Sequence, residues 1–435
     1  MANKKLTIEE KLKKQDYKQA NRFLWWFFNK IIIKLFMQPK FHPHYNIIDD
    51  INKEEGPCFV VYNHSSRSDY IWLTQACYPR RMNFVTGYNE FFRKKFKLIF
   101  KIIHQIPKKN FTTDLICMKG MKQIIKDNGI VCFSPEGMSS IVGHNQPVVN
   151  GTGKLFKHYN IPVYCMKIHG GYLTNNKVDL SDREGEVHVD FYKLFDKEDF
   201  EKNTPEELDL KLDEALWNDD YEWGQKNHIK FNAHGNICSH LHDICYRCPK
   251  CHSEFNMIGE KDYIKCNACG NTVHMNDYYE FVTEGDNVMP YESPSKWVDD
   301  ERRQVIKEIR EDENYAFEEE VYLGELPKYK YLKDPATTIR CGEGKIRIDH
   351  EGYHFRGTRN GEEFNFDLSY NTLFTLVVVT DCTFYGLYVN SEYLDIVPKR
   401  PTVGKQLLIT EEMHRLHVNK WKNFPWMSHL YESEK

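Results

Sequence analysis

Short apolar runs alternate with amphipathic stretches through the first half of the chain. Six runs have the length of strands, at 58–62, 83–86, 102–106, 130–133, 162–168 and 186–191. Between and after them, apolar residues recur at helical spacing, which predicts helices near 68–78, 89–100, 113–127, 152–159 and 205–217. This alternation predicts an α/β sheet flanked by helices, and such sheets bind ligands beyond the ends of their strands.

The pattern changes after about residue 232. Four cysteines cluster, and a charged stretch with helical spacing follows over 294–314. From about 320 to 409, short apolar runs alternate with glycine-containing turns, which predicts a small antiparallel sheet. We expect a terminal helix to begin near Thr410, with Glu411 and Glu412 in its first turn.

These changes divide the chain into five parts. At 435 residues it is long enough for two or three domains. The β-rich part resembles a PH-type lipid- or protein-binding domain in outline only. The predicted parts are an amphipathic N-terminal segment (1–40), an α/β domain (41–232), a cysteine-rich module (240–285), a charged helical linker (286–319) and a β-rich domain (320–425).

The N-terminal segment contains a dense aromatic run, Phe23–Met37. As a helix it would be about 22 Å long, short of the roughly 30 Å hydrocarbon core of a bilayer. Lys30 and Lys34 interrupt it, so we do not expect it to span a membrane. The paired Trp25 and Trp26 favour a helix in the membrane interface. The alternative is an amphipathic helix packed on its own domain.

Charge is unevenly distributed. The net charge is only -4, and no nucleic-acid partner is expected. Residues 1–40 carry ten Lys and Arg against three Asp and Glu, and residues 80–126 carry twelve against two. Such zones favour an anionic partner, such as a membrane surface or a phosphate, although a solvated basic face is the alternative. Single cysteines in the predicted strands indicate reduced core residues. With no secretory signal apparent, we expect a peripheral protein on the cytoplasmic face of a membrane.

A histidine and a carboxylate lie five positions apart directly after the first apolar run. The sequence from Asn63 to Asp69 reads NHSSRSD, so His64 and Asp69 follow the strand predicted over 58–62. A histidine oriented by a carboxylate can remove a proton from a hydroxyl group. The pattern alone is weak, because His44 and Asp49 repeat it before a polar linker and without a strand before them. Their position directly after a predicted strand favours His64 and Asp69 as the functional pair.

A second motif follows another predicted strand. Residues 133–140 read FSPEGMSS, about seventy positions after His64. The two motifs, in this order and at this distance, resemble those of the glycerophospholipid acyltransferases, of which lysophosphatidate acyltransferase is the type. The resemblance covers roughly residues 40–230. Asn160-Ile161-Pro162-Val163 matches a later, proline-containing block of that family.

The resemblance implies roles for the motif residues. His64 would be the general base that deprotonates an acceptor hydroxyl, and Asp69 would orient its imidazole. Glu136 and Gly137 would lie beside the acceptor, where Glu136 could bind a glycerol hydroxyl. The implied activity is O-acyl transfer in phospholipid biosynthesis. The donor would be acyl-CoA or acyl carrier protein, and the acceptor 1-acylglycerol-3-phosphate or a similar lysolipid.

Two positions depart from the family's pattern. Lys109 stands where the family usually has an arginine, and Ser139 replaces the arginine of the third block. Lysine is a point charge, whereas arginine binds phosphate with a bidentate fork. Phosphate recognition is therefore weakened or rerouted, and the acceptor's identity is open. The candidate contacts are Ser139, Lys108, Lys109 and Arg67, with Arg80 and Arg81 as further cations.

The four clustered cysteines form two CxxC pairs. Cys248 and Cys251 precede Cys266 and Cys269 by fourteen intervening residues. This spacing predicts a closed, tetrahedral structural Zn²⁺ site and resembles a zinc ribbon. Cys245, His252 and His274 are close in sequence but are not expected to be ligands.

Other classes of function fit less well. No G-x-S-x-G elbow is present, which disfavours a hydrolase. Acyl transfer to another polar-lipid hydroxyl or amine remains an alternative. A zinc-ribbon adaptor on a decayed acyltransferase fold is the other alternative, and it predicts loss of His64, Asp69 or Glu136, all of which are present.

Overall fold

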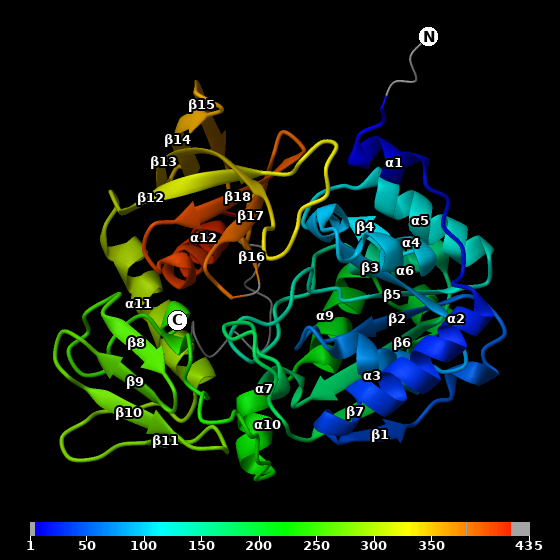
Figure 1. Cartoon of the computed structure of the whole chain (residues 1–435), viewed down its shortest axis with the longest axis horizontal. Coiled ribbons are helices and arrows are strands. Elements are labelled where there is room, and N and C mark those ends of the chain that lie inside the picture. The colour runs from blue at the N-terminus through cyan, green and yellow to red at the C-terminus, as the bar shows by residue number, and fades with distance from the viewer. Residues whose placement is uncertain (1–4, 380, 419–435) are drawn as a thin grey trace.

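The computed structural model describes residues 5–379 and 381–418. It contains a mixed seven-stranded sheet with helices, a four-stranded sheet that carries the clustered cysteines, and a seven-stranded antiparallel sheet with a terminal helix (Figure 1). This architecture confirms the predicted fold class. Residues 1–4 of the predicted N-terminal segment and 419–425 of the predicted β-rich domain lie outside the described residues.

The first sheet has the strand order β1-β7-β6-β2-β5-β3-β4. Its neighbouring strands are parallel except β6 and β7, which are antiparallel. The strands are β1 (Pro43–Ile47), β2 (Cys58–Tyr62), β3 (Met82–Gly87), β4 (Ile106–Lys108), β5 (Ile130–Phe133), β6 (Val163–His169) and β7 (Val187–Phe195).

Both faces of this sheet are buried. Along β2, Val60 packs into one apolar cluster and Val61 into another on the opposite face. Such strands are apolar throughout, which is why the continuous runs predicted them correctly. Helices α2 (Arg22–Phe27) and α3 (Asp69–Ala76) and the π-helix η1 (Phe28–Met37) contribute to the first cluster, and α5 (Leu115–Lys126), α6 (Thr152–Tyr159) and α9 (Pro205–Leu216) to the second.

Two predicted elements are misplaced, and one strand of the sheet was not predicted. The run 102–106 is not a strand, because α4 (Lys97–Ile102) precedes it and β4 begins only at Ile106. The helix predicted near 89–100 is a 3-10 turn, η4 (Tyr88–Phe92), followed by α4. Strand β1 was not predicted, since it lies at the edge of the sheet and is largely polar. His44 lies on this strand.

Shorter elements complete this part of the chain. Helix α1 (Ile8–Lys14) begins with a capping box between Thr7 and Glu10. The remaining helices are α7 (Gly171–Thr174), α8 (Lys197–Lys202) and α10 (Asp220–Lys226), and the remaining 3-10 turns are η2 (Pro39–Phe41), η3 (Ile51–Lys53) and η5 (Leu241–Asp243).

The second sheet is a four-stranded antiparallel meander. Its order is β11-β10-β9-β8, from β8 (Met257–Glu260), β9 (Tyr263–Cys266), β10 (Thr272–Met275) and β11 (Phe281–Val282). The charged stretch then forms α11 (Pro294–Glu311), close to its predicted span.

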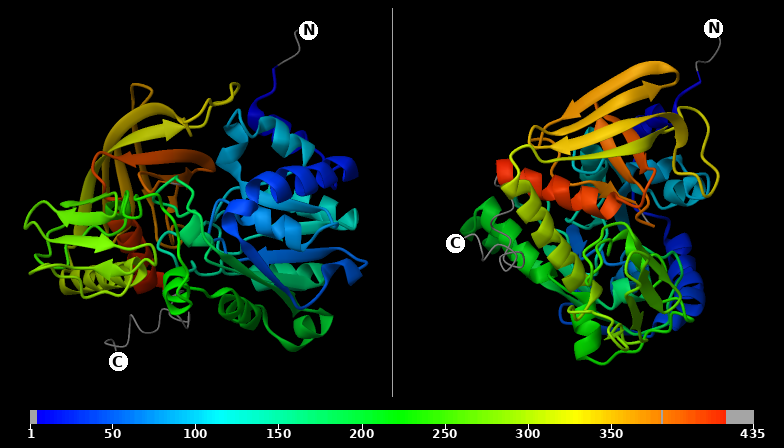
Figure 2. Two further views of the ribbon diagram at one scale, coloured as in Figure 1. Left: turned by 60° about the horizontal axis from the view of Figure 1, so that its bottom comes forward. Right: turned by 90° about the vertical axis from the view of Figure 1, so that its left-hand side faces the viewer.

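The third sheet is antiparallel, with the order β15-β14-β13-β12-β18-β17-β16. Its terminal helix α12 (Val403–Val418) lies beside α11 (Figure 2). The start predicted at Thr410 is therefore wrong by seven residues. The strands are β12 (Ala316–Glu325), β13 (Ile339–Asp349), β14 (Tyr353–Arg359), β15 (Glu362–Leu368), β16 (Val377–Val378), β17 (Tyr385–Val389) and β18 (Glu392–Pro398).

Each of the three sheets, with the helices packed on it, forms one body, and the bodies are numbered in chain order. One apolar core joins the three bodies. Tyr172 and Tyr221 of the first body belong to the same buried cluster as Met257 of the second and Ile396 of the third. The connection between β12 and β13 also crosses to the first body, where the amide of Leu332 donates to the carbonyl of Phe92 (2.8 Å). The bodies therefore pack as one unit.

Candidate active site

The motif at residues 63–69 is the turn between β2 and α3. The side chain of Asn63 both donates to the carbonyl oxygen of Ile168 and accepts from its amide, each over 2.7 Å. Because Ile168 lies on the neighbouring strand β6, this pair fixes the end of β2. The turn that follows leads directly into α3, whose first residue is Asp69.

His64 and Asp69 contact each other as the sequence predicted. Nδ1 of His64 lies 2.7 Å from Oδ2 of Asp69. The side chain of Asp69 is only 3% exposed, whereas that of His64 is 31% exposed. Because Nδ1 is hydrogen-bonded to Asp69, Nε2 is the ring nitrogen that remains for a substrate.

Other groups of the same turn hold the carboxylate of Asp69. The amide of Ser66 donates to both of its oxygens, and Oγ of Ser65 donates to Oδ1 over 3.2 Å. Burial raises the pKa of Asp69, although the hydrogen bonds from His64 and Ser66 oppose the shift. A carboxylate held in this way fixes both the tautomer and the orientation of the imidazole.

Glu136 holds the backbone of the same turn. Its Oε1 accepts from the amide of His64 (2.8 Å) and from Nδ2 of Asn145 (3.1 Å), and its Oε2 accepts from the amide of Gln146 (2.8 Å). The side chain is buried and does not line the cavity described below. Burial raises the pKa of Glu136 to about 8. The glycerol contact predicted for Glu136 stays a prediction, and the structure gives this carboxyl group a positioning contact instead.

Gly137 makes a close packing contact. Its φ is +78°, in the left-handed region, and a Cβ at this position would lie 2.6 Å from Cε1 of Phe111. The ring of Phe111 in turn contacts Phe374 of the third body, with ring centroids 4.8 Å apart. Glycine is thus required where the turn after β5 meets the connection between β4 and α5.

A cavity of about 1810 Å³ opens beside His64. It is larger than the roughly 300–1,000 Å³ typical of a small-molecule site, so it has room for a long lipid or for two substrates. Phe84, Met121 and Phe133 line it from the first body. Phe374 and Val377 line it from the third body, which therefore supplies the opposite wall.

The predicted phosphate contacts differ in where they lie. Arg67 and Ser139 line the cavity. Lys108 also lines it, but its Nζ donates to the carbonyl oxygens of Lys109 and Thr112, each over 2.6 Å. These three assignments stay predictions.

Lys109 lies outside the residues that line the cavity. Its Nζ donates to the carbonyl oxygen of Ser391 (3.0 Å) and lies 3.5 Å from Oε1 of Glu9. In this structure Lys109 thus joins α1 and the third body to the first body. Its predicted contact with phosphate stays a prediction.

The sequence pattern did not single out Lys177. This residue lies in the irregular connection between α7 and β7, is 5% exposed, and lines the same cavity as His64. Burial lowers the pKa of its ammonium group to about 8. Only the folded chain brings Lys177 to the site, so no local motif could have revealed it.

The other histidine motif forms no such pair. Nε2 of His44 lies 3.5 Å from Oε2 of Glu186, while Asp49 accepts from the amide of Lys193 over 2.9 Å. His44 on β1 faces His188 on β7, with ring centroids 4.6 Å apart. The contrast with His64 and Asp69 shows why strand context separated the two motifs.

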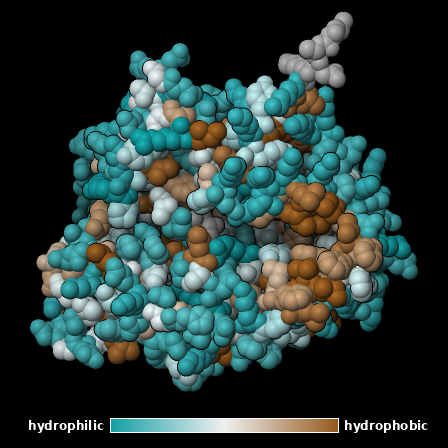
Figure 3. Space-filling model, viewed as in Figure 1, coloured by the Kyte–Doolittle hydropathy of each residue, from teal (hydrophilic) through white to brown (hydrophobic). Residues whose placement is uncertain are grey.

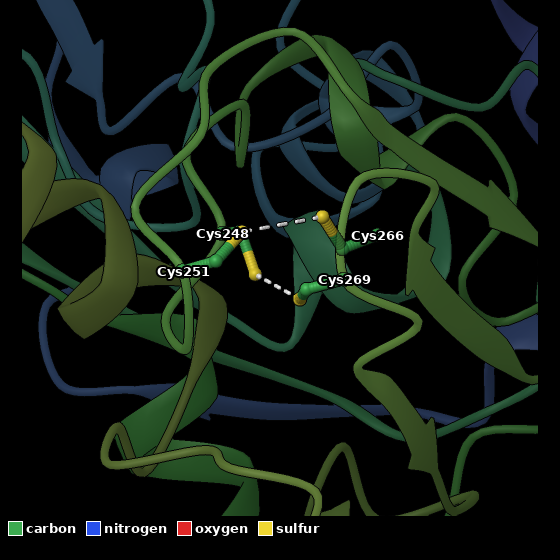
Figure 4. Close-up of side chains that lie close together, drawn as sticks. All are labelled: Cys248, Cys251, Cys266 and Cys269. Atoms are coloured by element: carbon green, nitrogen blue, oxygen red, sulfur yellow. Dashed lines mark hydrogen bonds between the residues drawn. The ribbon is translucent and has the colours of Figure 1, made fainter.

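The four predicted zinc ligands converge from two loops (Figure 4). The sulfur atoms of Cys248 and Cys269 are 3.7 Å apart, and those of Cys251 and Cys266 are 3.8 Å apart. With Zn–S bonds of about 2.3 Å, the edges of a tetrahedral ZnS₄ unit are about 3.8 Å. Amides of each knuckle also donate to the first sulfur of its pair, Cys248 or Cys266. The cysteine set therefore fits a structural zinc ion.

Apolar side chains are exposed beside the site. Phe23, Leu35 and Phe36 of α2 and η1 are exposed, and so are Leu98 of α4 and Leu115 of α5. Figure 3 shows apolar surface gathered over α4 and over the helices η1 and α3. Among the described residues, no helix combines the length and apolar character needed to cross a membrane.

Comparison with known proteins finds a family model that matches part of the chain. Residues 42–169 match the family model of the acyltransferases. This segment contains His64, Asp69 and Glu136, and the resemblance predicted from the two motifs is confirmed. No curated protein matches the chain.

Two solved structures show distant likeness. The chain is similar to the 1-acyl-sn-glycerophosphate acyltransferase PlsC of Thermotoga maritima at 15% identity and a TM-score of 0.37, over 48% of this chain and 78% of that one. It is also similar to the Ran-binding domain of the nuclear pore component NUP2 of Ashbya gossypii at 13% identity and a TM-score of 0.18, over 24% of this chain and 98% of that one. Both likenesses are too distant to assign a role to any residue.

Proposed function

We propose that the protein is an O-acyltransferase that esterifies a lysolipid such as 1-acylglycerol-3-phosphate, with acyl-CoA or acyl carrier protein as the donor. The observation that carries the proposal is the contact between Nδ1 of His64 and the buried carboxylate of Asp69 at the edge of a large cavity. The match of residues 42–169 to the acyltransferases supports the same reaction class.

The reaction needs one base and a route for one proton. Nε2 of His64 would take the proton of the acceptor hydroxyl as its oxygen attacks the carbonyl carbon of the thioester. The tetrahedral intermediate then collapses, the C–S bond breaks, and the leaving thiolate takes the proton from the imidazolium. Asp69 stabilises the imidazolium while it exists. A positioned base of this kind contributes about 10²–10⁴ in rate.

The reaction can be tested on the full chain. Acyl-CoA or acyl-carrier protein is supplied with a mixed lysolipid extract, free thiol is followed in time, and products are identified by mass spectrometry. We expect thiol release that depends on the lysolipid and is lost in His64→Ala. The control is His44→Ala, because His44 belongs to the other His-x4-Asp sequence and contacts Glu186 instead. Equal turnover in His64→Ala and the wild type would refute the mechanism.

We further propose that the protein acts as a peripheral protein on the cytoplasmic face of a membrane. The exposed aromatic and aliphatic side chains of α2, η1 and α4 support this proposal, together with the lysines of η1 and α4. None of the thirteen cysteines, all of which lie in the described residues, forms a disulfide bond, which suits a reducing compartment. In this position the cavity could receive a lysolipid directly from the bilayer.

The cysteine module is proposed to bind one structural zinc ion. Its four sulfurs form a closed set that leaves no position for a substrate. The module packs on the core shared by all three bodies, through Tyr246 and Met257 among others. Zinc would therefore stabilise the fold around the cavity and take no part in acyl transfer.

A further inference from the structure

Six cationic side chains line the cavity, and four of them are already held by protein groups. Three of them form ion pairs: Arg93 with Glu90 and Asp334, Lys95 with Asp334, and Arg340 with Glu343. The fourth, Lys108, donates to two carbonyl oxygens. These four cations are Arg93, Lys95, Lys108 and Arg340. The other two, Lys177 and Arg67, form no ion pair within the described residues.

The ammonium group of Lys177 forms fewer hydrogen bonds than the guanidinium group of Arg67. It can donate three hydrogen bonds, and its one bond in the described structure goes to the carbonyl oxygen of Ser139 over 3.2 Å. The residue is nevertheless 5% exposed. A buried charge is costly unless it is paired, so the site favours a ligand that brings negative charge.

A single peptide group connects Lys177 to the predicted base. The carbonyl oxygen of Ser139 accepts from Nζ of Lys177. The amide on the other side of that peptide, from Ser140, donates to the carbonyl oxygen of His64 over 2.7 Å. The ammonium group thus lies beside the turn that carries His64.

Carboxyl groups near Lys177 do not neutralise it. Asp69 is bound to His64, and the oxygens of Glu136 accept three donors from other residues. Attraction to Glu136 partly opposes the lowering of the pKa of Lys177, but the two groups form no ion pair in the described structure. Asp381 also lines the cavity, but its side chain accepts from Thr383 while its amide donates to the carbonyl oxygen of Lys177.

Arg67 supplies the second cation. Its Nε donates to Oδ1 of Asn175 (2.9 Å), and one terminal nitrogen donates to the carbonyl oxygen of Leu180 (2.9 Å). These contacts fix the guanidinium group on the cavity wall and leave its other terminal nitrogen for a ligand.

We propose that Lys177, assisted by Arg67, binds the phosphate of a phosphate-bearing acceptor and so determines which lysolipid the enzyme esterifies. This inference rests on the acyl transfer proposed above. In such an acceptor the phosphate is separated from the reacting hydroxyl by two carbon atoms. When that hydroxyl is at His64, the phosphate must lie in the immediate surroundings, where the ammonium of Lys177 is.

The donor is the less suitable source of the anion. The phosphates of coenzyme A are separated from its thioester by the long pantetheine arm, so they lie far from His64 when the thioester is there. Lys177 is buried, and it contacts the peptide group that binds the turn of His64. Its position therefore matches the acceptor.

The test compares two acceptors in Lys177→Met, which keeps the length of the side chain and removes its charge. We expect KM for 1-acylglycerol-3-phosphate to rise at least about tenfold, since a hydrogen bond between charged groups contributes about 1.5–3 kcal/mol and 1.4 kcal/mol is a factor of ten. KM for the donor, and turnover of the uncharged 1-acylglycerol, should stay unchanged. Lys177→Arg should restore much of the affinity. Lys95→Met, which removes a cavity lysine paired with Asp334, is the matched control.

The outcomes separate this inference from the proposed reaction. An increase in KM for acyl-CoA alone would assign Lys177 to the donor, and an equal loss of kcat with both acceptors would make it part of the catalytic machinery; either result overturns the inference. Calorimetric titration with glycerol 3-phosphate needs no turnover. Binding by the wild type that is lost in Lys177→Met would support the anion site even if no acyl transfer were found.

Discussion

Oε1 of Glu136 accepts the backbone amide of His64 over 2.8 Å, so the glutamate of one motif holds the histidine of the other. The two residues come from turns after neighbouring strands, β5 and β2. The contact fixes the chain that carries the base, whereas the sequence had suggested a contact between Glu136 and the acceptor.

The two roles of Glu136 predict different kinetics. In Glu136→Gln an NH₂ group replaces one carboxyl oxygen. It would face an N–H group that now donates to that oxygen, so the turn should shift. We expect kcat to fall about 10–100-fold with little change in KM, because a misplacement of about 1 Å can cost 10²-fold in rate. Steady-state kinetics over a range of acceptor concentrations measures both constants. A rise in KM with kcat preserved would instead support the direct contact with the acceptor.

Asp213 on α9 should make stability depend on pH. Its Oδ1 accepts from the amide of Val148 (2.9 Å), while its buried Oδ2 has no partner within the described residues, and burial raises its pKa to about 8. Between its ordinary pKa of 3.8 and about 8, the folded chain keeps a proton that the unfolded chain has lost. Stability therefore falls as pH rises through this window, by up to about 1.4 kcal/mol per pH unit.

Asp213→Asn should flatten this dependence, because the amide keeps an acceptor for Val148 and does not ionise. Urea unfolding at several pH values between 5 and 9 measures the effect. Glu214→Gln, on the exposed side of the same helix, removes an equal charge and should leave the wild-type slope unchanged. Parallel slopes for Asp213→Asn and the wild type would show that Asp213 is ionised in the folded chain.

Zinc should be stoichiometric and structural. We expect one zinc per chain by metal analysis, lost in Cys248→Ser with a fall in the melting temperature. Cys245→Ser should keep its zinc, because Cys245 is a buried thiol outside the cluster of four. A folded wild-type protein without metal after zinc-supplemented expression would contradict the assignment.

Membrane binding should depend on the exposed side chains of η1. Phe36 is 73% exposed, and burying such a ring in a bilayer interface contributes about 1.5–3 kcal/mol. Phe36→Ser should therefore weaken binding to vesicles containing anionic lipid by at least about tenfold in a sedimentation assay. Ile258→Ser, which changes an exposed residue of β8, is the control. Equal binding by all three proteins would place the membrane contact elsewhere.

Buried parallel strands were the most predictable part of the fold. β2 and β5 are apolar and buried at every position, and β6 is buried over its first four residues, so their continuous runs favoured strands. α12 was placed too late because nearly all of it is buried, including Glu411 and Glu412, which contact Arg302. An acidic pair usually marks an exposed first turn, whereas here Arg302 of α11 and Arg415 of α12 provide buried partners.

The site shows the same division between local and long-range information. His64 and Asp69 are five residues apart, and the turn between a strand and a helix brings them together, so the sequence was sufficient. Lys177 approaches Ser139 from a distance of 38 residues, and Phe374 reaches Phe111 from another body. Such contacts depend on the packing of the whole chain, which no local pattern specifies.

The core that the three bodies share has a consequence for synthesis on the ribosome. Residues 41–232 are synthesised before the third sheet, yet Tyr172 and Tyr221 belong to the same buried cluster as Ile396 and Leu408. Until the third sheet has emerged, the nascent segment 41–232 exposes an apolar face, and such surfaces are prone to aggregate. The cavity also lacks its second wall at that stage. Completion of the active site is therefore tied to completion of the polypeptide, so nascent chains that end early should be inactive even when His64 and Asp69 are already in place.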